Sequence, residues 1–380
     1  MTSTDPSAWR QRLPGSRRIV VKVGSTLLTT ADRSGVDGRM LLSLVTQLAA
    51  QRDAGRQVLL VSSGAVALGL GPMGLTERPS DLASMQACAA CGQVRLMHHY
   101  AEAFGTCRVA VGQVLLTHAD LADRRRYLNA RRTIAAMLDR GVLPIFNEND
   151  TVASDEIKLG DNDTLGAEVV GLSDSDGLIL LTDRDGLFTK DPRSNPDAVR
   201  VPFVSEVTDE VRAMAGGTAG LGTGGMGTKV SAAHLAGQSG AWTVVAPGRG
   251  TDVLARVMAG ADVGTLFAAS EDKQPARKRW IGGTLRPQGV LVVDAGAERA
   301  LQRGGSSLLP AGIRAVEGQF ESGEPVEIRG PDGTRLARGL SAYGSEEIQR
   351  IAGKKTHEIQ AILGYKYADE VIHRDDMVLG

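Results

Sequence analysis

The chain contains few aromatic residues and few cysteines. Among 380 residues there are 3 Trp, 5 Tyr and 6 Phe, so a hydrophobic core has to be built from Leu, Val, Ile and Ala. Three cysteines, at positions 88, 91 and 107, are too few for a disulfide framework. These shortages exclude the small disulfide-rich secreted class, whereas a hydrophobic content of 42% is ordinary for globular domains.

The sequence also lacks a large charge excess and long hydrophobic runs. Its formal net charge is −1, which gives no overall attraction to nucleic acid or to anionic lipid. No uninterrupted apolar run approaches the roughly 18 residues that span a bilayer. The first sixteen residues are polar and do not resemble a signal peptide. We therefore expect a cytoplasmic protein with no membrane segment and about two domains.

Strand-like and helix-like segments alternate along the first two thirds of the chain. Helices are predicted at 40–52 and 124–140, and apolar strands at 18–25, 58–65, 107–117, 142–150, 176–186 and 241–248. Apolar strands bounded by helices predict a mainly parallel sheet covered on both faces. Ligands of such sheets bind at the carboxyl ends of the strands, and the polar clusters KVGST, SSGA, NEND and TDRDG follow four of the predicted strands.

A glycine-rich loop, GLGTGGMGTK, occupies residues 220–229. A P-loop requires its lysine directly after the second glycine, but here Thr228 intervenes before Lys229, and the preceding segment does not resemble a strand. A P-loop is therefore excluded. Exposed glycine N–H groups, a helix starting near Lys229 and the charge of that lysine still favour phosphate binding. The alternative is a flexible surface loop with a solvated lysine.

Three other polar positions are candidates for the same site. Lys22 ends the first predicted strand, either as a second cation for phosphate or as an exposed strand end. GDND at 160–163 precedes a predicted helix; one residue could cap it, but two carboxylates and an amide exceed one cap. A surplus carboxylate could orient the lysines or help hold a phosphate-bound metal. NEND at 147–150 is either a turn or a pocket for an amine, with Asp150 as its charge partner.

The composition changes after about residue 271. EDKQPARKRW has the charge of a linker, short strand-like runs separated by turns begin at Gly289, and a helix is predicted near 346–351. The predicted domains are residues 1–270, a linker at 271–287, a small β-rich domain at 288–366 and a tail at 367–380. Residues 288–380 carry eleven Lys and Arg against fourteen Asp and Glu, and this formal charge of −3 disfavours binding to a phosphate backbone.

Five motifs in order carry a family resemblance: VVKVGST, LLVSSGAVALG, NENDTVASDEIKLGDND, LLTDRDGLFTKDPRSNP and GLGTGGMGTK. Together they resemble the amino acid kinase family, and in particular its bacterial glutamate-phosphorylating members. The later segment beginning WIGGTLRPQG resembles the start of the PUA domain that many of those enzymes carry. The resemblance runs from about Arg18 to the C-terminus. It implies an α/β fold, an αβα sandwich of the carbamate-kinase type with a mainly parallel sheet, followed by a small PUA β-barrel.

The resemblance also implies an activity. ATP, accompanied by Mg²⁺, would phosphorylate the γ-carboxylate of L-glutamate to γ-glutamyl phosphate, the first step of proline biosynthesis. Lys22 and Lys229 would be catalytic, with Asp163 holding them. The implied glutamate-binding residues are Ser63, Asp150 and Asn162. The implied ATP-binding residues are Lys22, Thr182, Asp183, Thr223, Gly224, Gly225, Met226, Gly227, Thr228 and Lys229. Family members often carry Ser at the position of Gly227, so a hydroxyl contact to phosphate would be missing here.

The partners implied are L-glutamate, proline as a feedback inhibitor and further copies of the chain in a dimer or tetramer. PUA domains elsewhere bind RNA, but the formal charge of −3 on residues 288–380 makes us expect no RNA binding here. The chemistry agrees with the residues, because a carboxylate is already ionised at neutral pH and needs no general base. Two alternatives remain open. One keeps the fold but changes the acceptor to aspartate, acetylglutamate, carbamate or a nucleoside monophosphate. The other is an RNA-binding protein whose kinase-like half senses metabolites.

Overall fold

The structure is a computed structural model that describes residues 5–30, 35–153, 162–216, 225–270 and 287–379. The chain divides into two compact units, residues 1–273 and 274–380, and each is described by itself below. Within the described residues, no helix is both long and apolar enough to cross a membrane.

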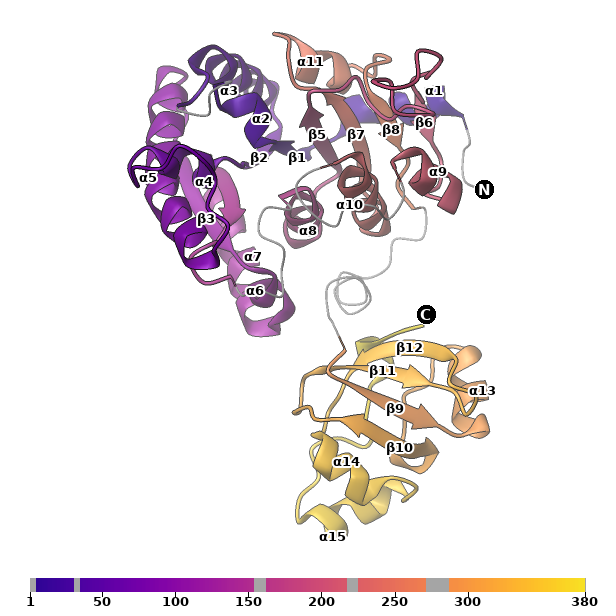
Figure 1. Cartoon of the computed structure of the whole chain (residues 1–380). Coiled ribbons are helices and arrows are strands. Elements are labelled where there is room, and N and C mark those ends of the chain that lie inside the picture. The colour runs from indigo at the N-terminus through magenta and orange to yellow at the C-terminus, as the bar shows by residue number, and fades with distance from the viewer. Residues whose placement is uncertain (1–4, 31–34, 154–161, 217–224, 271–286, 380) are drawn as a thin grey trace. The chain divides into compact units, whose positions relative to one another are not determined.

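The first unit is built around a sheet of eight strands in the order β3-β4-β2-β1-β5-β7-β8-β6 (Figure 1). The strands are β1 (Arg18–Val23), β2 (Gln57–Val61), β3 (Val111–Leu116), β4 (Leu143–Glu148), β5 (Gly177–Thr182), β6 (Phe203–Val204), β7 (Trp242–Pro247) and β8 (Thr265–Phe267). The six strands from β3 to β7 in that order are parallel, and β8 runs antiparallel to β7. The mainly parallel sheet predicted from the sequence is confirmed.

Helices cover both faces of this sheet. They are α1 (Pro6–Arg10), η1 (Leu13–Gly15), α2 (Ser25–Leu28), α3 (Gly38–Asp53), α4 (Ala65–Leu70), α5 (Leu82–Thr106), α6 (His118–Ala122), α7 (Arg124–Asp139), α8 (Asn162–Ser173), α9 (Asp209–Met214), α10 (Met226–Gln238) and α11 (Val253–Met258). Ile19, Val21 and Val23 of β1 pack in one hydrophobic layer with α3, α5 and α11. Val20 packs in the opposite layer with α7, α8 and α10 (Figure 1). Because side chains alternate along a strand, this is the αβα sandwich that the resemblance implied.

The alternation also decides where Lys22 points. Lys22 has the same parity along β1 as Val20, so its side chain enters the layer formed by α8 and α10. β1 lies between β2 and β5, and Lys22 pairs in register with Val61 and Leu180. The chain builds one half of the sheet from β1 to β4 and then continues with β5 on the other side of β1. Lys22 therefore lies at the position where the strand order reverses, which is where ligands bind in open α/β sheets.

Several predicted boundaries need correction. The strand predicted at 107–117 begins only at Val111, because the 25-residue helix α5 continues to Thr106 and is followed by a turn in which Arg108 has φ 56°. The strands predicted at 58–65 and 176–186 end at Val61 and Thr182, where small and polar residues lead into loops. The helix predicted at 40–52 is α3, which Asp37 caps through the N–H groups of residues 39 and 40.

Two glycines allow α4 and α5 to pack with their backbones almost in contact. A Cβ atom on Gly69 would lie 1.8 Å from the carbonyl oxygen of Cys88, and one on Gly92 would lie 1.8 Å from the carbonyl oxygen of Ala65. No side chain fits at either position. Since α4 begins at Ala65, the last residue of the SSGA segment, this contact holds the middle of α5 against that segment.

The second unit contains a five-stranded sheet in the order β10-β9-β11-β12-β13. Its elements are β9 (Gly289–Val293), α13 (Ala295–Gln302), η3 (Pro310–Gly312), β10 (Ile313–Gly318), β11 (Pro325–Arg329), β12 (Arg335–Leu340), α14 (Ser345–Ile351), η4 (Thr356–Glu358), α15 (Ile359–Leu363), η5 (Arg374–Asp376) and β13 (Met377–Leu379). The strands predicted from Gly289 onward and the helix near 346–351 are present. β13 was not foreseen; it pairs with β12, and Val371 and Ile372 lie in the same core.

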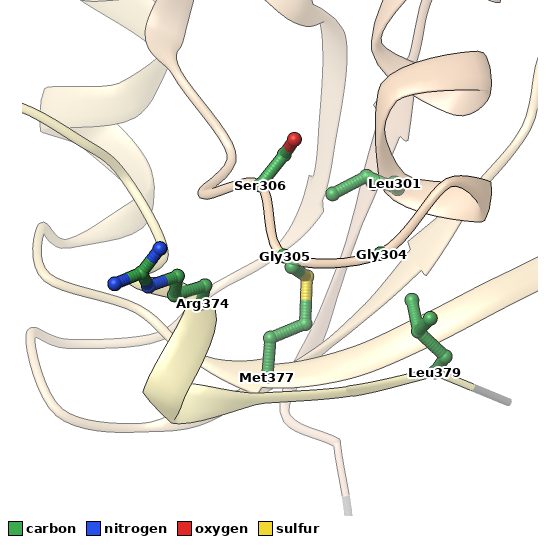
Figure 2. A pocket seen from close by; sticks show the side chains of 7 residues that line it. All are labelled: Leu301, Gly304, Gly305, Ser306, Arg374, Met377 and Leu379. Atoms are coloured by element: carbon green, nitrogen blue, oxygen red, sulfur yellow. The ribbon is translucent and has the colours of Figure 1, made fainter.

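A cavity of about 300 Å³ lies beside β13 in this second unit (Figure 2). It is lined by Leu301, Gly304, Gly305, Ser306, Arg374, Met377 and Leu379. Gly304 and Gly305 both have φ above +70°, which only glycine adopts easily. Arg374, one of the lining residues, is exposed.

Candidate active site

Three charged side chains meet inside the first unit. The Nζ atom of Lys22 lies 2.6 Å from Oδ1 of Asp163, and Nζ of Lys229 lies 2.9 Å from Oδ2 of the same carboxylate. Lys22 comes from β1, Asp163 from the first turn of α8 and Lys229 from the first turn of α10. Lys22 is 5% exposed, Lys229 6% and Asp163 0%. The structure thus brings together the three residues for which catalytic roles were predicted.

The cluster carries one more positive charge than negative charge. Burial opposes ionisation of Asp163, but the two ammonium groups outweigh it and hold the pKa of the carboxyl below its usual range. Two ammonium groups and one carboxylate leave a net charge of +1 in a place with little access to water. Because an uncompensated buried charge is costly, the cluster is suited to receive an anion.

The geometry contradicts both alternative interpretations, an exposed strand end at Lys22 and a helix cap at Asp163. Lys22 is not an exposed strand end, because it is buried and paired. Asp163 is not a helix cap: α8 already begins at Asn162, and the Asp163 carboxylate faces the two lysines and Thr228. Asp161, which was grouped with these residues, lies outside the described part of the chain.

Helix α10 begins earlier than the sequence suggested. It starts at Met226 with Gly225 as its N-cap, so Lys229 lies one turn inside the helix rather than at its start. Gly225 has no side chain to bond the first N–H groups of α10, and a Cβ at that position would meet no atom within 4 Å. The open N-terminus of this 13-residue helix can therefore offer N–H groups to an anion. The described part of the segment before the loop, which ends at residue 216, contains α9 and no strand, and this agrees with the rejection of a P-loop.

Most of the other predicted ATP-binding residues lie in the described part of the chain. Thr182 ends β5, is buried and donates its hydroxyl hydrogen to Oδ1 of the exposed Asp183 at 3.0 Å. Met226 and Gly227 form the first turn of α10. Thr223 and Gly224 lie outside the described residues. The hydroxyl of Thr228 lies 2.7 Å from Oδ2 of Asp163 and 2.8 Å from the carbonyl oxygen of Gly225, so it has two acceptors within the protein. The role of Thr228 in ATP binding stays a prediction.

Next to the charged cluster lies a group of neutral polar side chains around Asn162. Its Nδ2 lies 2.9 Å from the carbonyl oxygen of Ser62, 2.8 Å from Oγ of Ser63 and 3.0 Å from Oδ1 of Asn147, so its two hydrogens are shared among three acceptors. Ser62 is further bonded through its hydroxyl to the buried Tyr100 at 2.8 Å. Two of the three predicted substrate-binding residues, Ser63 and Asn162, are therefore in direct contact.

The amide oxygen of Asn162 has no hydrogen-bond partner among the described residues, although it is buried. A carbonyl group can only accept, so the contact with Ser62 forces the NH₂ group of Asn162 toward that carbonyl and turns its oxygen away. A buried acceptor without a donor costs about 1–3 kcal/mol. The site is therefore short of a hydrogen-bond donor at this oxygen.

Asp150, the third predicted substrate-binding residue, has only a weak positive partner, Arg78, among the described residues. Burial, with Glu148 as a second cause, raises the pKa of its carboxyl to about 7, and Arg78 only partly offsets this. It lies just beyond the end of β4, in the turn where the N–H of Val152 donates to the carbonyl oxygen of Asn149. An ammonium group beside Asp150 would restore the ionised form.

Comparison with known proteins agrees with this geometry. Residues 17–246, more than half of the chain, match the amino acid kinase family, and residues 289–363 match the PUA domain. The chain belongs to the amino acid kinase family. Glutamate 5-kinase of Geobacter sulfurreducens is 50% identical over 96% of this chain and 97% of its own length. The protein of the same name from Myxococcus xanthus is 48% identical over 98% of this chain and 99% of its own length.

A solved UMP kinase from Bacillus anthracis overlaps the kinase domain more distantly. It is 16% identical, covers 67% of this chain and 96% of its own length, and has a TM-score of 0.48. That likeness says nothing about the acceptor of this amino acid kinase. The acceptor has to be inferred from the near full-length relatives and from the polar groups around Asn162.

Two contributors to the kinase site were not identified from the sequence. Asn147 was noted only as part of the NEND cluster, but its amide bonds directly to Asn162. Gln93 lies on α5, and its Oε1 accepts from Nδ2 of Asn147 at 2.7 Å. No local motif surrounds Gln93. The one signal available was its spacing of seven residues from Gln86, which places both glutamines on one face of a helix.

Proposed function

We propose that this protein transfers the γ-phosphoryl group of ATP to the γ-carboxylate of L-glutamate. The observation that carries the proposal is the buried, net-positive cluster of Lys22, Asp163 and Lys229 directly beside an amide pocket that lacks a donor. The first feature suits a phosphate and the second suits an ammonium group. Relatives of almost the same length that are named glutamate 5-kinase support glutamate as the molecule with that ammonium group.

On the phosphate side, the two lysines neutralise charge on the transferring group. Phosphoryl transfer depends on positioning and electrostatic stabilisation, and ammonium groups fixed before the reaction need no reorganisation. Asp163 holds Lys22 and Lys229 at 2.6 and 2.9 Å, and Thr228 supports Asp163. The N-terminus of α10 and the loop after β5 complete the proposed ATP site, in which Thr182 and Asp183 border the nucleotide.

On the acceptor side, the proposed contacts are with the α-amino end of glutamate. Oδ1 of Asn162 accepts a hydrogen bond from the ammonium group, and ionised Asp150 supplies its counter-charge. Ser63 stays available through its hydroxyl, because it only accepts from Asn162 in the described contacts. With the amino end held there, the opposite γ-carboxylate can be directed toward the lysine cluster.

The reaction requires no general base. One oxygen of the γ-carboxylate attacks the γ-phosphorus of ATP, the bond to the β,γ-bridging oxygen breaks, and ADP leaves with that electron pair. Mg²⁺ would be bound chiefly by the nucleotide phosphates and would neutralise their charge. Among the residues that the structure describes, no group of three or more His, Cys, Asp or Glu side chains could hold a metal by itself.

An acceptor comparison tests the proposal. ADP release is measured in a coupled assay with L-glutamate, aspartate, acetylglutamate, carbamate and a nucleoside monophosphate as the acceptors. We expect turnover with L-glutamate to exceed that with each of the others by at least an order of magnitude. Faster turnover with another acceptor would leave the phosphate half of the proposal intact and overturn its acceptor half.

Further parts of the proposal concern the protein in the cell. We propose a cytoplasmic enzyme that supplies γ-glutamyl phosphate for proline biosynthesis, is inhibited by proline and assembles as a dimer or tetramer. The proposed domains are residues 1–270 and 288–366, joined by a linker at 271–287. For the PUA domain we propose a role in regulation or assembly, because the charge of −3 on residues 288–380 opposes binding to RNA.

A further inference from the structure

Three amide side chains form a line that leads from helix α5 to the proposed glutamate pocket. Oε1 of Gln93 accepts from Nδ2 of Asn147 at 2.7 Å, and Oδ1 of Asn147 accepts from Nδ2 of Asn162 at 3.0 Å. The three residues belong to α5, β4 and α8. A change at Gln93 can therefore reach Asn162 without Gln93 touching the substrate.

Two backbone groups favour one orientation of each asparagine amide in this line. The N–H of Glu148 donates to Oδ1 of Asn147 at 3.0 Å, and an N–H group cannot accept. The carbonyl of Ser62 accepts from Nδ2 of Asn162 at 2.9 Å, and a carbonyl cannot donate. The NH₂ group of Asn147 is consequently turned toward α5, where it requires an acceptor, and Gln93 provides one.

Contacts on two sides hold helix α5 in place near Gln93. Two helical turns before Gln93, Nε2 of Gln86 donates to the carbonyl oxygen of Ala153 at 2.9 Å. The same face of α5 thus contacts both ends of the segment 147–153, which includes Asp150. Gly92, next to Gln93, makes the close backbone contact with Ala65 that locks α5 against α4. The amide of Gln93 is presented by a helix that is fixed on both sides.

We propose that Gln93 is a positioning residue for the amino-acid acceptor. By accepting from Nδ2 of Asn147, Gln93 stabilises the orientation that the N–H of Glu148 favours, in which Oδ1 of Asn147 lies beside Nδ2 of Asn162. Asn162 is thereby held with its Oδ1 as the acceptor for the substrate ammonium group. The inference rests on the proposed function, since it concerns how glutamate is bound. It adds a residue that lies outside the substrate and ATP pockets and acts only through the two asparagines.

Steady-state kinetics of Gln93→Leu and Gln93→Glu test the proposal. Leucine removes the acceptor, whereas a glutamate side chain still offers an oxygen to Nδ2 of Asn147. Loss of one hydrogen bond of ordinary strength predicts a rise of about 3- to 10-fold in the KM for L-glutamate in the leucine variant. We expect kcat and the KM for ATP to change less than about twofold, and Gln93→Glu to recover most of the loss. Val94→Ala, the next residue on α5 and 72% exposed, is the matched control.

Two further measurements separate positioning from general damage to α5. Glutarate has both carboxylates of glutamate but no amino group, so its KM should be the same in wild type and Gln93→Leu. In an Asn162→Ala background, Gln93→Leu should add less than twofold, because the effect passes through Asn162. An equal effect on glutarate, a full effect in the Asn162→Ala background, or equal behaviour of the two Gln93 variants would overturn the positioning role.

Failure of the proposed function has a different outcome. Wild-type protein without glutamate-dependent ADP release would reject glutamate as the acceptor, whatever the Gln93 variants do. Crystal structures of wild type and Gln93→Leu then test the line of amides alone. We expect the Asn147 amide to rotate in the variant and its 3.0 Å contact with Asn162 to be lost. Asn147 and Asn162 side chains in unchanged positions would refute the role of Gln93.

Discussion

The two halves of the site are formed by different kinds of side chain, although α8 contributes to both. Asp163 belongs to a charged cluster in which two lysines share one carboxylate. Its neighbour Asn162 belongs to a network of neutral amides and hydroxyls. The charged half has a surplus of positive charge, while the neutral half has a surplus of hydrogen-bond acceptors. The surplus positive charge of the first half suits an anionic ligand. The unpartnered amide oxygen of the second half suits a ligand that donates a hydrogen bond, such as an ammonium group.

The comparison explains how one helix can serve two ligands. Successive residues of a helix point about 100° apart, so adjacent positions at the start of α8 face different neighbours. Asp163 faces β1 and α10, whereas Asn162 faces the ends of β2 and β4. Substitutions in the charged half should therefore affect mainly turnover, and substitutions in the neutral half should affect mainly the binding of the acceptor.

The largest effect is expected from Lys229→Ala. Removing one preorganised charge that stabilises the transferring group typically lowers kcat by about 10²- to 10³-fold. The coupled ADP-release assay measures this loss, and circular dichroism checks that the variant is folded. Lys354→Ala, an exposed lysine of the second unit, is the control and should retain wild-type turnover. Full activity of Lys229→Ala would contradict the proposed role of the charged cluster in phosphoryl transfer.

A smaller effect, on KM rather than kcat, is expected from Asp150→Ala. Loss of a charged partner for an ammonium group predicts a rise in the KM for L-glutamate of about 10- to 100-fold. The KM for ATP should stay within about twofold, because Asp150 is proposed to contact the amino end of glutamate and not the nucleotide. A change confined to the KM for ATP would contradict the proposed contact between Asp150 and glutamate.

The pH dependence should sharpen the comparison further. Because the pKa of Asp150 is raised to about 7, the carboxyl is mostly protonated at pH 6 and mostly ionised at pH 8. Only the ionised form attracts an ammonium group, so affinity for glutamate should increase as the pH rises. One titrating group with this pKa predicts a fall of about tenfold in the KM for glutamate between pH 6 and pH 8. In Asp150→Asn this dependence should disappear; a variant that keeps the wild-type profile would assign it to another group.

The smallest effect is expected from Thr228→Val. Its hydroxyl bonds to Oδ2 of Asp163, so the substitution removes one support of the charged cluster while keeping the size of the side chain. A loss of about 2- to 10-fold in kcat corresponds to one hydrogen bond of ordinary strength. Thr228→Ser retains the hydroxyl and should recover most of the turnover. If serine and valine behave alike, the hydroxyl has no role in holding Asp163.

Much of the fold could be predicted because it depends on local patterns. Asp37, the apolar spacing of residues 41–48 and Gly55 determine where α3 begins and ends. Long apolar strands indicated the parallel sheet. No helix was predicted where α5 lies, because its run of small residues between 83 and 92 lacks the spacing of an amphipathic helix. The short strand β13 pairs only with β12, which the sequence around residue 377 does not indicate.

The sequence by itself determined the strands, the glycine-rich loop and which residue types could bind phosphate or an amine. It also determined that Lys22 shares a face of β1 with Val20, because side chains alternate along a strand. Only the tertiary structure decided that Asp163 receives both lysines, that Thr228 faces Asp163 and that Gln93 reaches Asn162 through Asn147. These contacts join residues on different strands and helices, so they depend on the order of strands in the sheet and on which helices cover each face.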